Sequence, residues 1–405
     1  MKNVLGAVIA LDDAFLDGMR QVADPPADRV ADDMCQRGDH RVFAQLIKSR
    51  QVWQDNGEVS PLLAPDVRQY LTASNVLPAW HDPALINRAE NFFLLFGLSS
   101  ATQLSCASLP ECYVMKYGTE VLAFTKFLQA DPSRRIRETA QMVMDVMCPG
   151  GLVSAKGVGR GVHATQKVRL MHAIIRYMIQ QDPGSRANPI DPALREKFGA
   201  PINQEDMVYT LMTFSYVVIE GYRHLGVPMN ATARNAYVHC WNVVGSLMGI
   251  REELLPADFE ASRELFDRIQ QRQHGESDAG RKLTRALLGV LEAPMPRVLK
   301  ALPAVLTREL VGHESADALG IAVAPPLDRV VAWVALRFWA AAAWVLSRLN
   351  FSRPYRMASE FLHRRIMDHL GGLPGNAPFD IPPEFIEQWF PGEAGHVAAA
   401  VAAKD

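Results

Sequence analysis

The sequence predicts an all-α fold, because of its length, its composition and the spacing of its apolar residues. The chain has 405 residues, of which 49% are hydrophobic and 21% charged, so it can bury a large core. At this length we expect one large domain or two closely packed ones. Apolar residues recur at helical spacing over long segments, whereas the sequence shows neither convincing alternating strands nor Asn-Gly hairpins.

The expected helices follow one another from the first third of the chain. The periodicity of amphipathic or buried helices occurs in four segments, 41–56, 61–75, 83–104 and 109–128. The next helix has the strongest start signal, because Asp131 supplies an acidic N-cap and Pro132 occupies the first helical position. Pro149 and the two glycines after it end that helix.

A glycine-rich segment, 156–162, separates the two halves of this helical pattern. It lacks the Gly-Lys-Ser/Thr ending of a phosphate-binding loop, so we interpret it as a flexible turn. The helix after it contains His172, and Asn203 is expected to cap the following helix. Further helices are expected over 231–249 and 256–273, with a weaker helical group from residue 283 onward.

Charge, cysteine content and missing motifs exclude several classes of protein. The formal net charge of −2, without a basic stripe, argues against nucleic-acid binding. The five cysteines are scattered without Cys-x-x-Cys spacing, so neither a disulfide framework nor a structural zinc site is expected. No Gly-x-Ser-x-Gly or His-Glu-x-x-His motif is present, which removes the main support for a serine hydrolase or a zincin.

The N-terminal segment does not have the pattern of a secretory signal. Its apolar run, 4–11, is short and is followed at once by Asp12 and Asp13, so we expect a cytoplasmic protein. The segment 330–346 is the nearest to a membrane span, but it contains Arg337 at its centre. A buried helix is the favoured interpretation. Peripheral membrane contact and the oligomeric state stay open.

One histidine on an apolar helix is the first candidate for chemistry. Arg169 precedes His172 by three residues and Arg176 follows it by four, so the three side chains share one side of a helix. An imidazole between two guanidinium groups on an apolar surface suits haem, which offers iron, a hydrophobic macrocycle and two propionates. No Cys-x-x-Cys-His is present, so haem would be held without covalent attachment. The alternative is a satisfied core histidine between arginines that extend to water.

A second polar cluster precedes it on the helix that begins at Pro132. Arg135, Glu138 and Thr139 share a face that continues into apolar residues, so they form either a catalytic cluster or an internal salt bridge with a hydroxyl partner. Thr210 and Thr213 lie one turn apart on a later helix, where threonine can also satisfy itself on the preceding carbonyls.

Five segments, in order, resemble the bacterial latex clearing proteins (rubber oxygenases) and the wider MpaB-type oxygenase family. The resemblance covers roughly residues 25–275. The matching segments are Ser108-Leu-Pro110 with Tyr113, Arg134-Arg135-Ile with Glu138-Thr139, Lys167-Val-Arg169-Leu-Met-His172-Ala with Arg176, Pro201-Ile-Asn-Gln204-Glu-Asp206 leading to Thr210, and Trp241 with Gly245.

The resemblance implies a globin-like helical core with additional N- and C-terminal helices, holding a non-covalent haem b. We expect a catalytic domain over 1–280 and a C-terminal helical extension over 281–405 that packs on the same unit. In this family pattern His172 is the proximal iron ligand, and Arg169 and Arg176 support it and the propionates. The other positions that the resemblance implicates are Thr210 in cofactor binding and Arg135, Glu138, Thr139 and Glu120 around the oxygen-binding and catalytic side.

Two departures from the family pattern bear on the substrate. Rubber-cleaving members, which use dioxygen to split the double bonds of polyisoprene, can have a distal lysine where this chain has Glu138. The missing secretion signal also disfavours an extracellular polymer. We therefore expect a haem-dependent oxygenase that uses O2 on a smaller apolar, unsaturated, isoprenoid or lipid-like molecule. The alternatives are a haem protein that binds or senses a gas, and a helical family member that has lost haem.

Overall fold

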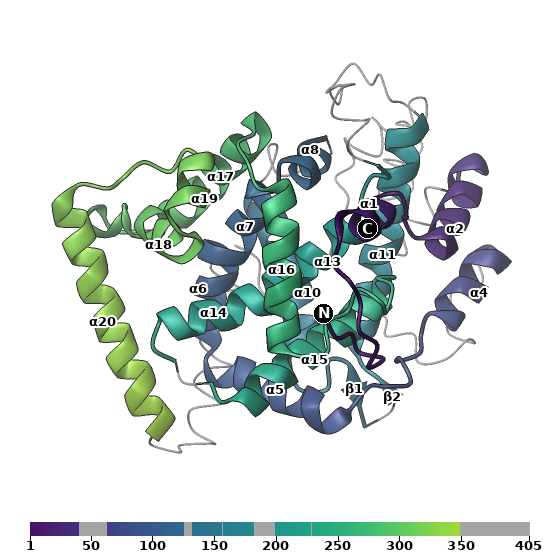
Figure 1. The fold of residues 1–405 in the computed structure, drawn as a ribbon, viewed down its shortest axis with the longest axis horizontal. Coiled ribbons are helices and arrows are strands. Elements are labelled where there is room, and N and C mark those ends of the chain that lie inside the picture. Colours follow the sequence, from purple (N-terminus) through teal and green to yellow (C-terminus); the bar gives the residue numbers. More distant parts are fainter. Residues whose placement is uncertain (40–62, 125–131, 156, 182–198, 228, 349–405) are drawn as a thin grey trace, which may run out of the picture.

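The computed structural model describes residues 1–39, 63–124, 132–155, 157–181, 199–227 and 229–348 (Figure 1). The predicted all-α class is confirmed: this part of the chain consists of helices and a single two-stranded hairpin. The predicted helix at 41–56 lies outside the described residues. The elements of the first half are α1 (Asp13–Arg20), α2 (Pro25–Gln36), α4 (Pro65–Ala73), α5 (Pro83–Leu95), α6 (Gly97–Gln103), the π-helix η1 (Leu104–Ser108), α7 (Leu109–Val114), α8 (Lys116–Phe124), α10 (Pro132–Met147), β1 (Val153–Ser154), β2 (Gly157–Val158) and α11 (Arg160–Gln181).

The second half continues the helical pattern. Its elements are α13 (Gln204–Phe214), α14 (Tyr216–His224), α15 (Ala231–Leu247), α16 (Phe259–Gln273), α17 (Asp278–Glu292), the 3-10 helix η2 (Arg297–Leu299), α18 (Leu302–Val311), α19 (His313–Ala318) and α20 (Pro326–Arg348).

The core forms around α15, which packs against α5, α11, α13 and α16 (Figure 1). Trp241, Tyr237 and Cys240 of this helix are almost wholly buried, together with Tyr209 of α13. Burial of such aromatic side chains is a large part of the driving force for folding. The core therefore lies where α11 and α13 meet α15.

Local sequence signals explain where the central helices begin. Asn203 accepts a hydrogen bond from the backbone N–H of Asp206 at 3.0 Å, which is the cap predicted for α13. Asn230 caps α15 through Ala233 in the same way. Pro83 occupies the first turn of α5, where its missing N–H is not needed.

The glycine-rich segment between α10 and α11 differs from the flexible turn that the sequence suggested. Its two ends pair as an antiparallel hairpin, with Val153 opposite Val158. Gly159 lies so close to the preceding loop that a Cβ atom there would be 2.1 Å from the carbonyl oxygen of Gly150. The glycines therefore permit close backbone packing that turns the chain directly into α11.

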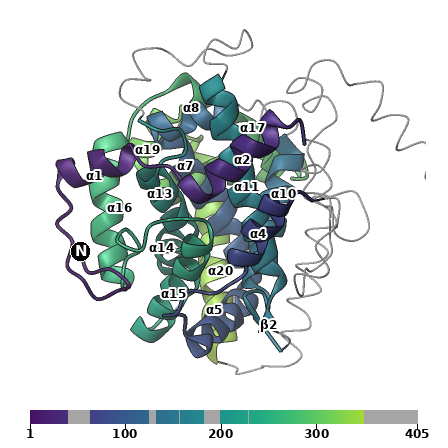
Figure 2. The same ribbon diagram turned by 90° about the vertical axis from the view of Figure 1, so that its right-hand side faces the viewer.

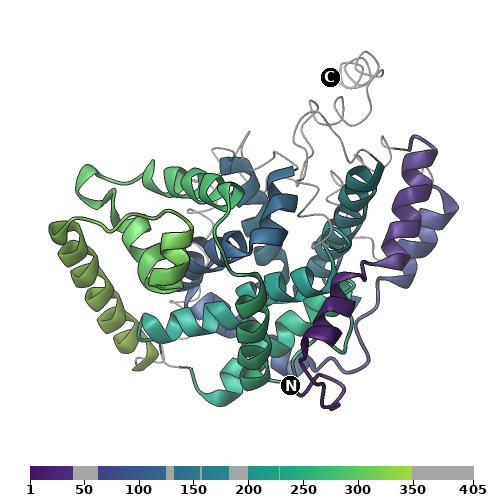
Figure 3. The ribbon, with the colours of Figure 1, turned by 45° about the horizontal axis from the view of Figure 1, so that its top comes forward.

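The C-terminal helix α20 also differs from the expectation of a buried helix. One side of it packs on α18 and η2 and buries Ala332, but Trp333 and Phe338 on the other side are 57% and 76% exposed. Figures 1 and 3 show α20 at one edge of the molecule, with no described element on its outer side. The expectation was wrong because helical packing covers only one side of this apolar segment. Within the described ranges, no single helix is long and apolar enough to cross a membrane.

A candidate cofactor and substrate cavity

A cavity of about 260 Å³ lies inside the helical core. Its walls are formed by α7, α8, α10, α11, α13 and α15 and consist mostly of aliphatic, aromatic and methionine side chains. The polar side chains that reach it are few: Cys112, Tyr113, Glu138, Thr139, His172, Asp206, Tyr209 and Thr210. A largely apolar cavity with a few polar groups is the usual form of a small-molecule or cofactor site.

The cavity extends along α13. Asp206, Thr210 and Phe214 are spaced four residues apart and all line it, which gives a length of roughly 12 Å at 1.5 Å per residue. Thr210 is exposed, although its neighbours Tyr209 and Leu211 are buried. The accessible surface of Thr210 therefore faces the cavity.

His172 reaches the cavity from the opposite helix, α11. It lines the wall with Val168, Met171 and Ile175, which are the positions of a helical stripe at i, i+3, i+4 and i+7. The imidazole is half-buried, and its Nδ1 atom is inaccessible to water. The sequence singled out this histidine, and the structure places it on the wall of this apolar cavity.

The two arginines beside His172 have partners outside the cavity. Arg169 pairs with Asp24 at 2.6 Å, and Arg176 pairs with Asp28 at 2.6 Å. Neither arginine lines the cavity, because both lie about 40–60° further round α11 than His172. They hold α2 against α11, an arrangement visible in Figures 1 and 2. The sequence suggested propionates as their partners; the structure provides carboxylates of α2.

The second predicted cluster is split between the cavity and its surroundings. Glu138 and Thr139 of α10 both line the cavity, and Oε1 of Glu138 accepts a hydrogen bond from Nε of Arg134 at 3.0 Å. Glu138 is thus part of an ion pair, but its partner is Arg134, and the pair with Arg135 that the sequence suggested as the alternative stays a prediction. The backbone of Arg135 belongs to α10, but its side chain lies outside the described atoms. Glu120 is half-buried on α8 and does not line the cavity.

A buried carboxyl group behind the cavity wall was missed by the sequence analysis. Tyr209 lines the cavity and donates a hydrogen bond from its hydroxyl to Oε2 of Glu111 at 3.2 Å. Gln270 of α16 donates to the same oxygen at 3.4 Å. Burial in this apolar junction raises the pKa of Glu111 to about 7. The one signal in the sequence was an acidic residue inside an apolar segment, directly after Pro110.

A thiol, a hydroxyl and a backbone carbonyl form a further polar contact at this wall. Sγ of Cys112 lies 3.2 Å from Oγ1 of Thr213, and Thr213 donates to the carbonyl of Thr210 at 2.8 Å. Burial raises the pKa of Cys112 to about 12, so its thiol stays protonated. The cysteine therefore serves as a wall of the cavity and not as a nucleophile.

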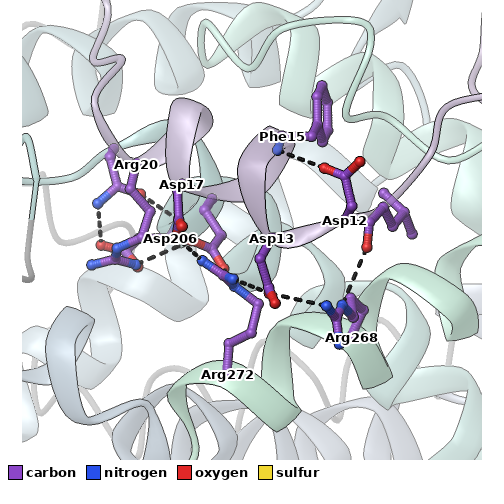
Figure 4. A network of polar contacts seen from close by, with 11 residues as sticks. Asp12, Asp13, Phe15, Asp17, Arg20, Asp206, Arg268 and Arg272 are labelled. Atoms are coloured by element: carbon purple, nitrogen blue, oxygen red, sulfur yellow. Dashed lines mark hydrogen bonds and ion pairs between the residues drawn. The ribbon is translucent and has the colours of Figure 1, made fainter.

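A network of ion pairs holds the N-terminal end of α13 (Figure 4). Nη1 of Arg20 lies 3.1 Å from Asp206 and 3.3 Å from Glu205, and Arg272 of α16 pairs with the other oxygen of Glu205 at 3.0 Å. Arg272 also pairs with Asp13 of α1. Asp206, which lines the cavity, is thereby tied to α1, and the neighbouring Glu205 links α1 to α16. The sequence analysis predicted neither α1 nor the ion pairs that the acidic residues at the start of α13 make with it.

Three comparisons with known proteins agree with this architecture. The family model for the ER-bound oxygenase mpaB/B'/Rubber oxygenase catalytic domain matches residues 94–348, which is more than half of the chain. The rubber oxygenase of Streptomyces sp. (strain K30) is 25% identical over 343 residues, covering 82% of this chain and 77% of that protein. The solved structure of latex clearing protein LCP in the closed state has the same fold, with a TM-score of 0.73 at 22% identity over 90% of this chain and 94% of that one. The chain therefore belongs to the family of mpaB/B' and rubber oxygenase catalytic domains.

Proposed function

We propose that this protein is a haem b-dependent oxygenase that uses O2 to oxidise or cleave an apolar, unsaturated substrate of the isoprenoid or lipid type. The observation that carries the proposal is His172, an imidazole on the wall of a mostly apolar cavity in a chain of this oxygenase family.

The donor set fits a haem better than a bare metal ion. The described residues contain no group of three or more His, Cys, Asp or Glu side chains that could hold a metal ion. A porphyrin supplies four nitrogen ligands of its own, so one neutral imidazole is sufficient to hold its iron. His172 is the imidazole among the described lining residues, and the apolar walls suit the macrocycle.

When bound, haem would supply the binding and activation of dioxygen. His172 would hold the iron, and the salt bridges Arg169–Asp24 and Arg176–Asp28 fix the helix that presents it. We assign the arginines this positioning role in place of propionate binding, because each already faces a carboxylate and no Lys or Arg belongs to the described lining residues.

The remaining polar residues divide into two groups by position. Glu138 and Thr139 lie together on α10, where a carboxylate next to Arg134 and a hydroxyl can orient bound oxygen or accept a proton. Thr210 presents its exposed surface to the cavity from α13. The catalytic roles predicted for Arg135 and Glu120 remain proposals that rest on the family pattern.

The substrate class follows from the walls. Many apolar side chains line the cavity, among them Leu122, Met142 and Phe214. A hydrocarbon would bind to them because its apolar surface is removed from water. An extended cavity along α13 suits a linear molecule. A family relative is named for its action on rubber, and a shorter isoprenoid meets the same apolar requirement.

The test combines absorption spectra with oxygen uptake. Protein produced with sufficient haem should show a Soret band. It should consume O2 when an isoprenoid such as squalene is added in detergent micelles, with carbonyl products detected by hydrazine derivatisation. Absence of a Soret band would refute the haem assignment. A Soret band without O2 uptake across a panel of alkenes would refute the oxygenase assignment and favour a gas-binding protein.

A further inference from the structure

Exposed apolar side chains gather on α20. Eleven large hydrophobic side chains are exposed in the described part of the chain, and five of them belong to this one helix. They are Leu327 (73% exposed), Val330 (58%), Trp333 (57%), Val334 (54%) and Phe338 (76%), which we call the α20 face. Val323 just before the helix and Val298 of the neighbouring η2 extend it. Such a concentration marks a surface that binds something.

The α20 face is an apolar stripe that only Arg337 interrupts among the described side chains of its arc. At 100° per residue, its five members fall within an arc of about 140° on the helix. Ala332 lies about 170° from the middle of this arc, on the side of α20 that packs on its neighbours, and is 1% exposed. Apart from Arg337, which falls within the arc, the outward side of α20 is apolar, unlike that of an ordinary surface helix.

Exposed cations lie within this stripe and on the elements beside it. Arg329 and Arg337 belong to α20, and Arg297 and Lys300 belong to η2 and the residue after it. The guanidinium of Arg337 lies 5.2 Å from the ring centroid of Trp333. A basic, apolar helix with an arginine stacked on a tryptophan has the composition of helices that lie in the headgroup region of a bilayer.

We infer that the α20 face docks on the surface of an anionic lipid membrane. The helix would lie parallel to the bilayer, with the five apolar side chains at the boundary of the acyl chains. The four cations would reach the phosphates, Arg337 by extending its side chain along Trp333. A second copy of the chain fits less well, because the exposed cations of the two copies would face one another and repel.

The inference does not depend on the haem assignment. It does add a physical route for the proposed substrate class, since apolar isoprenoids and lipids partition into membranes. A protein that fails to bind haem can still be tested for membrane docking, and the two hypotheses can therefore fail separately.

The experiment is flotation of the full chain with vesicles in a sucrose gradient. One set of vesicles is phosphatidylcholine alone, and the other contains about a third phosphatidylglycerol. The double variant Trp333→Glu/Phe338→Glu removes the apolar contact. Leu5→Glu/Val8→Glu is the matched control, because these side chains are 57% and 83% exposed and lie at the N-terminus. Circular dichroism and thermal unfolding verify that both variants fold as the unchanged protein does.

We expect the unchanged protein and the control to float with the anionic vesicles, and the α20 variant to bind them at least tenfold more weakly. Arg297→Gln/Arg329→Gln should weaken binding about fivefold per charge removed, and only to vesicles that contain phosphatidylglycerol. This effect of the substitutions should become smaller at high salt, which screens the charges. The inference is overturned if the unchanged protein floats with neither type of vesicle. It is also overturned if the α20 variant binds the anionic vesicles as strongly as the control variant does. Self-association that only the α20 variant abolishes, without vesicle binding, would show that a second copy covers this face.

Discussion

The guanidinium of Arg169 binds both oxygens of the Asp24 carboxylate, with Nε at 2.6 Å from Oδ2 and Nη2 at 2.8 Å from Oδ1. This two-point contact joins the helix that carries His172 to the start of α2, which is 145 residues away in the sequence. Gly249 closes over the pair with φ +84°, and a Cβ atom there would be 2.5 Å from Oδ2 of Asp24. The position of the proposed iron ligand thus depends on a buried ion pair that itself touches no cavity surface.

Removal of this arginine should destabilise the fold strongly. In Arg169→Ala the Asp24 carboxylate, whose side chain is 2% exposed, loses its counter-charge, so the free energy of unfolding should fall by about 3–5 kcal/mol. Urea unfolding followed by circular dichroism measures this. Arg223→Ala, which breaks the exposed pair with Glu220, is the control and should cost less than about 1 kcal/mol. Equal effects of the two variants would contradict the account of Arg169.

Stability should decrease as the pH rises from about 4.5 to 7. Burial raises the pKa of Glu111 and of Glu90 to about 7 in the folded protein, against 4.5 for the free side chain. In this window the folded state retains protons that the unfolded state has released, so stability present at low pH is lost as the pH approaches 7, by on the order of 3 kcal/mol per group.

Glu111→Gln isolates one of these two groups. The amide keeps an acceptor for Tyr209 but cannot ionise, so the slope of unfolding free energy against pH should decrease. The contribution of Glu90 to the slope should remain. Denaturant unfolding at several pH values checks this. An unchanged slope would mean that Glu111 does not titrate in this range.

A methyl group at Gly245 should push a lining side chain into the cavity and reduce the cavity volume. A Cβ atom at this position would be 2.5 Å from Cδ2 of Leu211, which lines the cavity. Gly245→Ala should therefore lower stability by about 1–3 kcal/mol and reduce the rate with bulky substrates. Gly289→Ala is the matched control, since nothing lies within 4 Å of its Cβ position and a helical alanine should stabilise by about 0.5–1 kcal/mol. Destabilisation by both changes would contradict the packing argument.

Substitution of two threonines one turn apart should have different effects, one on activity and the other on stability. Thr210 is exposed to the cavity, so Thr210→Val should change substrate turnover several-fold and leave the unfolding free energy nearly unchanged. Thr213 is buried and bonded to the carbonyl of Thr210, so Thr213→Val should cost about 1 kcal/mol. Measurements of oxygen uptake and of unfolding on both variants test this. A stability loss in Thr210→Val together with an activity change in Thr213→Val would contradict the account, because the cavity would then lie on the Thr213 side of α13.

The sequence predicted the helices that form the cavity and four of its polar residues. Apolar periodicity and the cap at Asn203 were sufficient for α10, α11, α13 and α15, because these signals are local. His172 and Thr210 were found in the same way, as polar residues on apolar faces. The partners of Arg169 and Arg176 were not predictable, since they come from a distant helix. Nor could composition distinguish a buried α20 from one that packs on one side only, because an apolar stripe has the same spacing in both cases.

The central claim is that His172 holds haem iron, and haem content measures it most directly. Purified protein should contain about one haem per chain by the pyridine haemochrome assay. His172→Ala should lose the Soret band and regain it when imidazole is added, because the cavity then accepts an external ligand. The control is His163→Ala, on the same helix but outside the cavity lining, which should keep its haem. Full haem content in His172→Ala without imidazole would contradict the account.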